Sequence, residues 1–287
     1  MWNNLFSIGP ITVHGYGLMI AIGVMMAMFI GVKRAPKLGL DKDHIYNLTF
    51  YCLLFGLIGA KLLFGIVEIK KIIEDPSFFL SGEGFVVYGG IITGVLTGFI
   101  YCRVKHLEFF RYADIVLPSV AVAQGFGRIG CFLAGCCYGV ETNSVIGITF
   151  TQSQYAINHV DLVPTQLISS GLNFLHFFVL IIIAKRIKVH GVIAGCYLMF
   201  YSAGRFILEF FRGDLDRGNV GSISTSQFIA IFTFLFGLAV VVIQLMRNAK
   251  KAETYGEMKA ERFEEALLEN VDEDGQAEQK EEEESQE

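Results

Sequence analysis

Apolar residues occur in long stretches, which alternate along the chain with short polar and basic segments. A helix needs about 20 mostly apolar residues to cross the hydrocarbon core of a bilayer. Stretches of about this length lie at 16–32, 46–67, 85–102, 113–134, 166–184, 191–211 and 226–246. The pattern predicts an all-α integral membrane protein with about seven transmembrane helices.

Basic residues are unevenly distributed among the loops between these stretches. Lys and Arg in short loops are retained on the cytoplasmic side of a membrane. They follow the first, third, fifth and last stretches, at Lys33, Arg34, Lys37 and Lys42, at Arg103, Lys105 and Arg111, at Lys185, Arg186 and Lys188, and at Arg247, Lys250 and Lys251. This alternation predicts an N-terminus outside and a C-terminus in the cytoplasm. The polar loop at 140–163 has no Lys or Arg, and we expect it to form a small outer cap.

The composition also indicates a membrane protein. Apolar residues make up 53% of the 287 residues, charged residues make up 18%, and the mean hydropathy is +0.51. The net charge of -5 arises from Asp and Glu that crowd into the C-terminal segment, which is too polar to bury a core. We therefore expect a transmembrane domain over 1–250 and an acidic, disordered cytoplasmic tail over 251–287. The expected surroundings are a lipid bilayer, and no nucleic-acid partner is expected.

Ionisable residues inside the apolar stretches are few, and most of them are basic. Such groups are costly in lipid, so they usually face the bundle interior or a wet cavity and mark functional sites. Arg205 and Glu209 are four residues apart on one helical face with Tyr201 and Arg212, which is compatible with a structural ion pair. Lys61, Arg128, Arg205 and Arg212 together outnumber Glu209. The excess positive charge predicts an anionic ligand, most simply a phospholipid phosphate, which guanidinium groups bind bidentately.

The glycines around Arg128 match a dinucleotide-binding fingerprint only formally. Gly125, Gly127 and Gly130 have the required spacing, but the fingerprint needs a preceding strand and an acidic residue about 20 positions later. This segment lies inside an apolar stretch instead. Glycine there permits close helix approach or leaves room for a ligand. We expect no nucleotide and no other cofactor.

Three of the six cysteines, Cys131, Cys136 and Cys137, are clustered in the sequence. A metal or redox centre is one interpretation, but no Cys or His pair lies at a known ligand spacing from them. Small packing side chains are the simpler interpretation. The sequence alone therefore predicts no metal site.

Taken in order, the motifs of the chain resemble those of the prolipoprotein diacylglyceryl transferases of bacterial inner membranes. The resemblance extends from Ile8 to about Met246. It rests on His14-Gly15-Tyr16-Gly17, Gly89-Gly90, Gly127-Arg128-Ile129-Gly130 through Gly139, Pro164-Thr165-Gln166-Leu167, and Gly204-Arg205 through Arg212.

The resemblance implies a multi-pass enzyme of the bacterial cytoplasmic (inner) membrane. The implied reaction transfers diacylglyceryl from phosphatidylglycerol to the lipobox cysteine thiol of a preprolipoprotein signal peptide, forms a thioether and releases glycerol phosphate. The implied catalytic residues are Arg128, Arg205, Tyr88 and Glu209. The implied substrate-binding residues are Tyr16, Tyr201, Gly89, Gly90, Gly127, Gly130, Gly139 and Arg212.

The sequence departs from the family pattern at four positions. Tyr88 replaces a histidine before Gly89, Cys131 an asparagine, Cys136 a glutamate and Val163 a histidine. Because a free thiol ionises near pH 8.5, loss of the first histidine removes the most obvious base. Two alternatives stay open. One is a divergent phospholipid-using transferase with another acceptor, in which Cys131 or Cys136 would be the nucleophile. The other is a non-catalytic lipid-binding or transport protein.

Overall fold

A computed structural model of the protein describes residues 4–8, 11–80, 84–213, 219–221 and 223–252. The chain divides into two compact units, Met1–Val241 and Val242–Glu287. The first unit contains all of the residues discussed below except the far end of the last helix. The acidic tail expected at 251–287 lies almost wholly outside the described residues.

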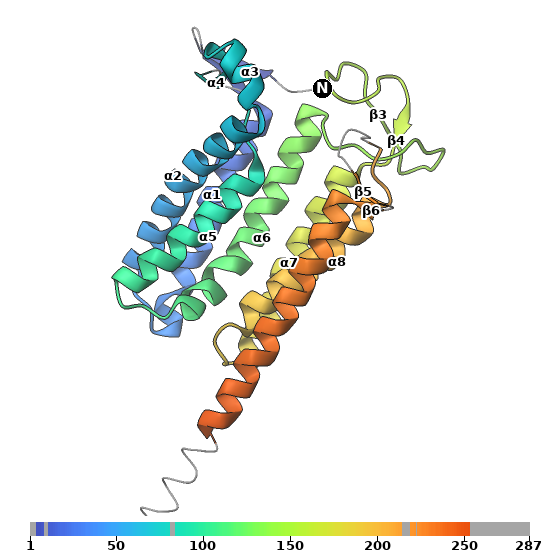
Figure 1. Ribbon diagram of the computed structural model, residues 1–287. Helices are drawn as coiled ribbons and strands as arrows, with labels where there is room; N and C mark the ends of the chain where they lie inside the picture. The colour runs from blue at the N-terminus through green and yellow to red at the C-terminus, as the bar shows by residue number, and fades with distance from the viewer. Residues whose placement is uncertain (1–3, 9–10, 81–83, 214–218, 222, 253–287) are drawn as a thin grey trace, which may run out of the picture. The chain divides into compact units, whose positions relative to one another are not determined.

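Within the described residues, seven helices are long and apolar enough to cross a membrane, as the sequence predicted. They are α1 (Gly15–Arg34), α2 (Lys42–Val67), α5 (Val87–Val104), α6 (Phe109–Ala134), α7 (Thr165–Arg186), α8 (Val192–Glu209) and a last helix at Thr225–Ala252 that carries no label in Figure 1. Each begins and ends within a few residues of the predicted stretch, apart from longer ends on α2, α6 and the last helix. The fold is therefore that of a multi-pass membrane protein.

Shorter elements connect these helices, and the sequence analysis did not predict them. The 3₁₀ helix η1 (Pro36–Leu38) follows α1, and α3 (Ile69–Glu74) and α4 (Ser77–Leu80) lie between α2 and α5. Three antiparallel two-stranded sheets pair β1 (Asn4–Ile8) with β2 (Ile11–His14), β3 (Ile148–Thr149) with β4 (Asp161–Leu162), and β5 (Asn219–Val220) with β6 (Ile223–Ser224).

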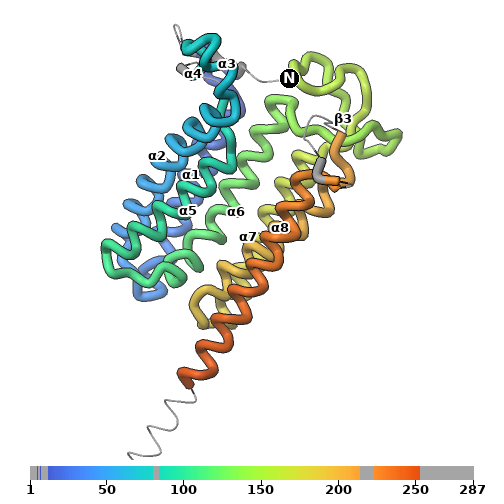
Figure 2. The backbone as a smooth tube through the Cα atoms, viewed as in Figure 1, coloured from blue at the N-terminus to red at the C-terminus, as the bar shows by residue number. Residues whose placement is uncertain are grey.

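Helix α6 is the centre of the first unit. It packs along α1 on one side and along α7 on the other, while α2 packs mainly on α5 (Figures 1 and 2). Helix α8 contacts both α6 and α7. A cluster of buried residues joins α6 to α7 and α8: Ala121, Leu180, Ile193 and Tyr197. The three helices α6, α7 and α8 thus form one packed group, and the candidate site lies within it.

The N-terminus of α8 is fixed by a carboxylate from α6. Asp114 accepts hydrogen bonds from the backbone N–H groups of Gly191, at 2.7 Å, and Ala194, at 2.8 Å. The first N–H groups of a helix have no partner within the helix, and negative charge is stabilised there. Asp114 could not be singled out from sequence, because its acceptor role becomes visible only once α6 and α8 are side by side.

The segment between α6 and α7 has a small core of its own. Phe150, Ala156 and Leu162 are buried against one another, with Phe132 of α6 packed on them. The Thr149 hydroxyl donates a hydrogen bond to the Asp161 carboxylate across the β3–β4 pair. The polar segment at 140–163 is therefore folded onto the end of α6, and its location outside the membrane stays a prediction.

The predicted orientation is tested by reporter fusions. Because basic residues follow α1, α5, α7 and the last helix, we expect a reporter inserted after Arg247 to be cytoplasmic. A reporter inserted between Thr142 and Asn158 should be external. Paired alkaline phosphatase and fluorescent-protein fusions at the two positions measure this directly. The reverse pattern would refute the orientation.

Candidate functional site

A polar stripe runs along α7, although that helix is one of the most apolar in the chain. Its buried polar side chains recur three or four residues apart, which places them on one helical face. They are Gln166, Ser169, Ser170, Asn173 and His176. The Ser170 hydroxyl donates to the Gly125 carbonyl of α6 at 2.9 Å. The stripe therefore faces α6, and the sequence analysis missed it because none of these residues is charged at neutral pH.

A pocket opens between α6, α7 and α8, with about 350 Å³ of space not filled by protein atoms, its open mouth included. Helix α7 lines the pocket with the polar face described above, and α8 lines it with the face that carries Tyr201 and Arg205. The lining residues are Arg128, Ser169, Leu172, Asn173, His176, Phe200, Tyr201, Gly204, Arg205 and Leu208. Arg128, Tyr201 and Arg205, which the sequence analysis proposed as site residues, thus meet in one pocket.

Arg128 is a half-buried cation in the wall of this pocket. Across the described ranges, no carboxylate lies within ion-pair distance of its guanidinium group. A charged group in a membrane span is costly unless it is paired or reaches water. The pocket therefore has the charge and the opening required to bind an anion.

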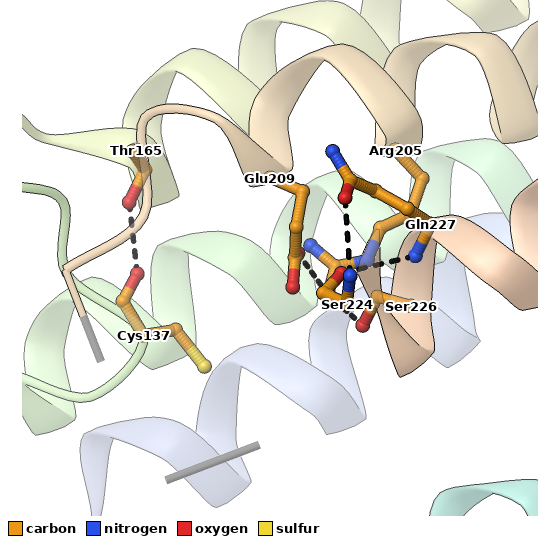
Figure 3. A network of polar contacts seen from close by, with 7 residues as sticks. All are labelled: Cys137, Thr165, Arg205, Glu209, Ser224, Ser226 and Gln227. Carbon is orange, nitrogen blue, oxygen red and sulfur yellow. Dashed lines mark hydrogen bonds and ion pairs between the residues drawn. The ribbon is translucent and has the colours of Figure 1, made fainter. Parts of the chain in front are cut away.

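Arg205, in contrast, is held by two protein groups (Figure 3). Its Nη2 lies 2.8 Å from Glu209 Oε2 and donates to the Ser226 hydroxyl at 2.8 Å. The two side chains of the ion pair are only 17% and 7% exposed. The expected pair between Arg205 and Glu209 is therefore formed, and it fixes the direction of the guanidinium group.

Ser226 is positioned by the start of the last helix. Gln227 N–H donates to the Ser224 hydroxyl at 3.1 Å, and Ser224 N–H donates to Gln227 Oε1 at 3.2 Å. This reciprocal pair is a capping box, which fixes where a helix begins. The first turn of the last helix is thereby placed beside Arg205.

His176 is a second unpaired polar group at the pocket. It is 8% exposed, and its Nε2 has no hydrogen-bond partner among the described residues. Its ring stacks on Tyr197, with 5.1 Å between ring centroids, and Tyr197 donates to Gln124 of α6 at 3.0 Å. A buried ring nitrogen without a partner is uncommon, so a ligand in the pocket has an available hydrogen-bonding group here.

Tyr16 lies beside Gly130, on the face of α6 that packs on α1. A Cβ added to Gly130 would approach Tyr16 to 3.1 Å, so Gly130 allows α1 to pack closely on α6. A Cβ added to Gly127 would meet nothing within 4 Å. Gly130 thus serves helix packing, while Gly127 leaves open space one residue before Arg128.

Gly139 and Arg212 come together beyond the ends of α6 and α8. Their backbones form an isolated antiparallel bridge, flanked by a hydrogen bond of 3.1 Å from Val140 N–H to the Phe211 carbonyl. A Cβ at Gly139 would lie 2.6 Å from the Val163 carbonyl oxygen. Only glycine fits this approach, which carries Arg212 back toward the end of α6.

Tyr88, Gly89 and Gly90 lie at the beginning of α5 and outside the pocket wall. A Cβ on Gly89 would lie 2.3 Å from the Gly59 carbonyl oxygen, so these glycines let α5 pack on α2. Tyr88 itself is 46% exposed.

Lys61 is also separate from the arginines. Its Nζ lies over the rings of Phe64, Phe79 and Phe85, at 5.1, 5.5 and 5.1 Å from their centroids. Lys61 therefore does not add to the positive charge of the pocket.

The three clustered cysteines are brought together at the end of α6. Their Sγ atoms all lie within 4.8 Å of one another, and none forms a disulfide. Hydrogen bonds with Cys131 and Cys136 lower the pKa of the Cys137 thiol, and the positive charge of Arg212 acts in the same direction. Cys131 is three residues after Arg128 and so shares its face of α6.

Comparison with known proteins identifies relatives along most of the chain. The family model described as prolipoprotein diacylglyceryl transferase matches residues 3–243. A phosphatidylglycerol--prolipoprotein diacylglyceryl transferase of Clostridium tetani is 45% identical over 85% of this chain and 98% of its own length. A second, from Clostridium perfringens, is 41% identical over 83% and 94%. One from Staphylococcus aureus is 32% identical over 84% and 88%.

Proposed function

Because the chain belongs to the prolipoprotein diacylglyceryl transferase family, we propose that it transfers diacylglyceryl from phosphatidylglycerol to a prolipoprotein. The acceptor is the thiol of a lipobox cysteine in the signal peptide. The products are a thioether-linked diacylglyceryl prolipoprotein and glycerol phosphate. The enzyme works in the cytoplasmic membrane of a bacterium, where both substrates are embedded.

The observation that carries this proposal is the unpaired Arg128 in a pocket between membrane spans. Arg128 and Arg205 line the same pocket, and among the residues that the structure describes only Arg205 has a carboxylate partner. The rest of the wall combines the polar face of α7 with apolar side chains at Leu172, Phe200 and Leu208. A membrane ligand with one anionic group and acyl chains satisfies both properties, and a phospholipid is such a ligand.

The arginines would act on the leaving group of the reaction. The acceptor sulfur attacks the glycerol carbon of the diacylglyceryl group, and the bond from that carbon to the phosphate oxygen breaks. Its electron pair remains on glycerol phosphate, where negative charge grows in the transition state. Cations already in place stabilise that charge without reorganisation. Arg128 binds the phosphate directly in this scheme, and Glu209 holds Arg205 in the orientation needed to assist.

The remaining site residues have supporting roles in the proposal. Tyr201 lines the pocket beside both arginines, where its hydroxyl donates to a donor oxygen. His176 and Asn173 lie on the α7 wall and bind uncharged polar atoms of the donor, such as ester carbonyls. Tyr16, Gly127, Gly130, Gly139 and Arg212 shape the region around the end of α6, where the peptide enters.

Mass spectrometry of an acceptor peptide tests the activity. The purified full chain is incubated with phosphatidylglycerol and a lipobox peptide, and we expect the peptide to gain one diacylglyceryl group through a thioether. A peptide with serine in place of its cysteine is the control and should stay unmodified. An unmodified cysteine peptide, with the protein folded and the lipid present, would contradict the proposal.

Tyr88 lies outside the pocket wall, so its place in the site rests on the family resemblance, and its variants test whether the donor also reaches the beginning of α5. Its hydroxyl is a poor base at neutral pH, because the unperturbed pKa of tyrosine is about 10, but it is an adequate hydrogen-bond donor to an anion. We expect Tyr88→Phe to slow transfer by roughly 10- to 150-fold, the loss of one charge-assisted hydrogen bond worth about 1.5–3 kcal/mol. Tyr88→His should retain activity.

Tyr46→Phe is the matched control, because Tyr46 is 45% exposed and Tyr88 is 46% exposed. Tyr46 lies near the beginning of α2, away from the pocket wall. Initial transfer rates of the three variants and the unchanged chain give the comparison. Equal rates for Tyr88→Phe and Tyr46→Phe would remove Tyr88 from the proposed site.

A further inference from the structure

The three clustered thiols are a candidate site that the pocket does not use. Cys131 belongs to the last turns of α6, and Cys136 and Cys137 follow that helix directly. Their Sγ atoms can all reach one point, since none is more than 4.8 Å from the others. Cys52, Cys102 and Cys196 lie in α2, α5 and α8 and belong to no such group among the described residues.

The backbone at the end of α6 is shaped to bring these thiols together. Gly135 caps the helix in the left-handed region at φ 75°, and Cys136 N–H donates back to the Cys131 carbonyl at 3.1 Å. Cys137 is also left-handed, at φ 61°, which is uncommon for a residue with a side chain. The chain therefore reverses within three residues and returns two thiols over the first.

The N-terminal turn of α7 holds this reversal in place. Thr165 donates its hydroxyl to the Cys137 carbonyl at 2.9 Å (Figure 3), and Gln166 Nε2 donates to the Cys136 carbonyl at 2.8 Å. Gln166 is 1% exposed. Both carbonyls are thus fixed by buried side chains of α7, and the turn that carries Cys136 and Cys137 is held in place.

Three thiols without a carboxylate or imidazole in the group suit a thiophilic ion. Thiolates select soft and borderline metals such as Zn²⁺. Zinc–sulfur bonds of about 2.3 Å place the sulfurs of a tetrahedral site about 3.8 Å apart. Separations of at most 4.8 Å reach that value with side-chain movements of about 1 Å or less.

We propose that Cys131, Cys136 and Cys137 bind one Zn²⁺ or a similar thiophilic divalent ion, whose open fourth position takes the acceptor thiol. The second half rests on the proposed transferase function. Each of the four thiols releases a proton to water on binding, so the acceptor arrives as a thiolate. Its sulfur then attacks the glycerol carbon, the carbon–oxygen bond to phosphate breaks, and the resulting thioether leaves the ion.

The position of the cluster fits this role. Cys131 is one helical turn from Arg128, and Arg128 is close enough to Cys131 and Cys137 to interact with them electrostatically. The donor phosphate at Arg128 and a thiolate at the cluster would therefore lie next to each other. The ion also supplies what Tyr88 lacks, because coordination to a cation deprotonates a thiol without a general base.

Metal binding is tested apart from activity. The full chain in phosphatidylglycerol nanodiscs is stripped with a chelator and titrated with Cd²⁺, and sulfur-to-metal charge-transfer absorption is followed. We expect the unchanged chain to bind one Cd²⁺. A triple variant with Cys131→Ser, Cys136→Ser and Cys137→Ser should bind Cd²⁺ at least about 100-fold more weakly. A Cys136→Ser single variant guards against misfolding of the triple variant.

The chain supplies a matched control in its other three cysteines. Cys52→Ser, Cys102→Ser, Cys196→Ser removes the same number of thiols and should bind Cd²⁺ like the unchanged chain. Equal binding by the two triple variants, or a disulfide within the cluster of the purified protein, would overturn the metal site.

Binding of the acceptor thiol to the ion is tested by the visible spectrum of Co²⁺-loaded protein and by transfer rates. In the Co²⁺-loaded chain, a lipobox peptide should shift the visible spectrum, and the peptide with serine for cysteine should not. Metal-free protein should transfer at least about 10-fold more slowly and recover with Zn²⁺. If protein verified as metal-free transfers at the same rate as metal-loaded protein, the acceptor role of the ion is wrong, whereas the metal site itself is unaffected. Absence of transfer in both loaded and stripped protein, with Cd²⁺ binding intact, would instead refute the proposed function and the acceptor role together.

Discussion

Replacing Arg128 by alanine is expected to lower diacylglyceryl transfer by at least about 10²–10³-fold, the loss associated with removing one stabilising group from a developing anion. Arg128 lines the pocket, and within the described ranges no carboxylate pairs with it. Its charge is therefore available to the donor phosphate. Arg128→Lys should recover only a small part of the rate, because an ammonium group does not reproduce a bidentate fork.

Arg111→Ala serves as the control for this variant. Arg111 lies on the same helix near its opposite end, where it donates to the Leu38 carbonyl at 3.0 Å. Its rate should stay within about twofold of the unchanged chain, since a surface substitution of this kind has a small effect. Initial rates with saturating lipid measure both. Full activity of Arg128→Ala, at normal expression and folding, would remove Arg128 from the donor site.

Glu209→Leu is expected to destabilise the folded protein by about 3–5 kcal/mol, because it leaves Arg205 without its carboxylate partner in a membrane span. Both side chains of this pair are mostly buried, at 17% and 7% exposed. Replacing both members removes the unpaired charge. We therefore expect the Arg205→Met, Glu209→Leu double variant to recover most of the lost stability.

Activity separates the two roles of the pair. The double variant should have lost transfer, because it lacks the Arg205 guanidinium group, although its unfolding midpoint in detergent returns toward that of the unchanged chain. Urea unfolding in mixed micelles and transfer rates are measured on the same preparations. A stable and active double variant would show that the pair serves the fold alone.

The seven spans could be predicted from sequence because lipid imposes a single requirement of length and polarity on each of them. The short elements between the spans could not be predicted from sequence. The β3–β4 pair has only two residues in each strand, and its core at Phe150 and Leu162 forms from positions 12 residues apart. Neither a helical nor a strand period is visible over such distances.

Sequence could single out the pocket-lining residues that are charged, but not those whose place depends on contacts between helices. Arg128 and Arg205 are conspicuous in an apolar stretch, and the structure brings them to one pocket with Tyr201. His176 and Asn173 are neutral, so only their spacing along α7 could have indicated a buried polar face. Lys61 was counted with the arginines because sequence gives charge without position.

The cysteine cluster illustrates the same limit. The spacing of the three cysteines matches no known metal-ligand motif, and the sequence alone therefore predicted no metal site. The thiols converge because Gly135 and Cys137 both adopt left-handed backbone, which reverses the chain immediately after α6. Sequence indicates such a reversal only weakly, since a glycine after a helix is common.

The intrahelical pairing of Arg205 with Glu209 has a consequence for biogenesis. The two side chains are four residues apart on α8, so they can neutralise each other before any other span is present. An isolated arginine at the centre of a span costs about 2.5–3.5 kcal/mol on insertion scales. Helix α8 can therefore leave the translocon as a nearly neutral segment. Arg128 has no such partner on α6, and its entry into lipid depends on neighbouring spans or on a bound phospholipid as the newly made chain assembles.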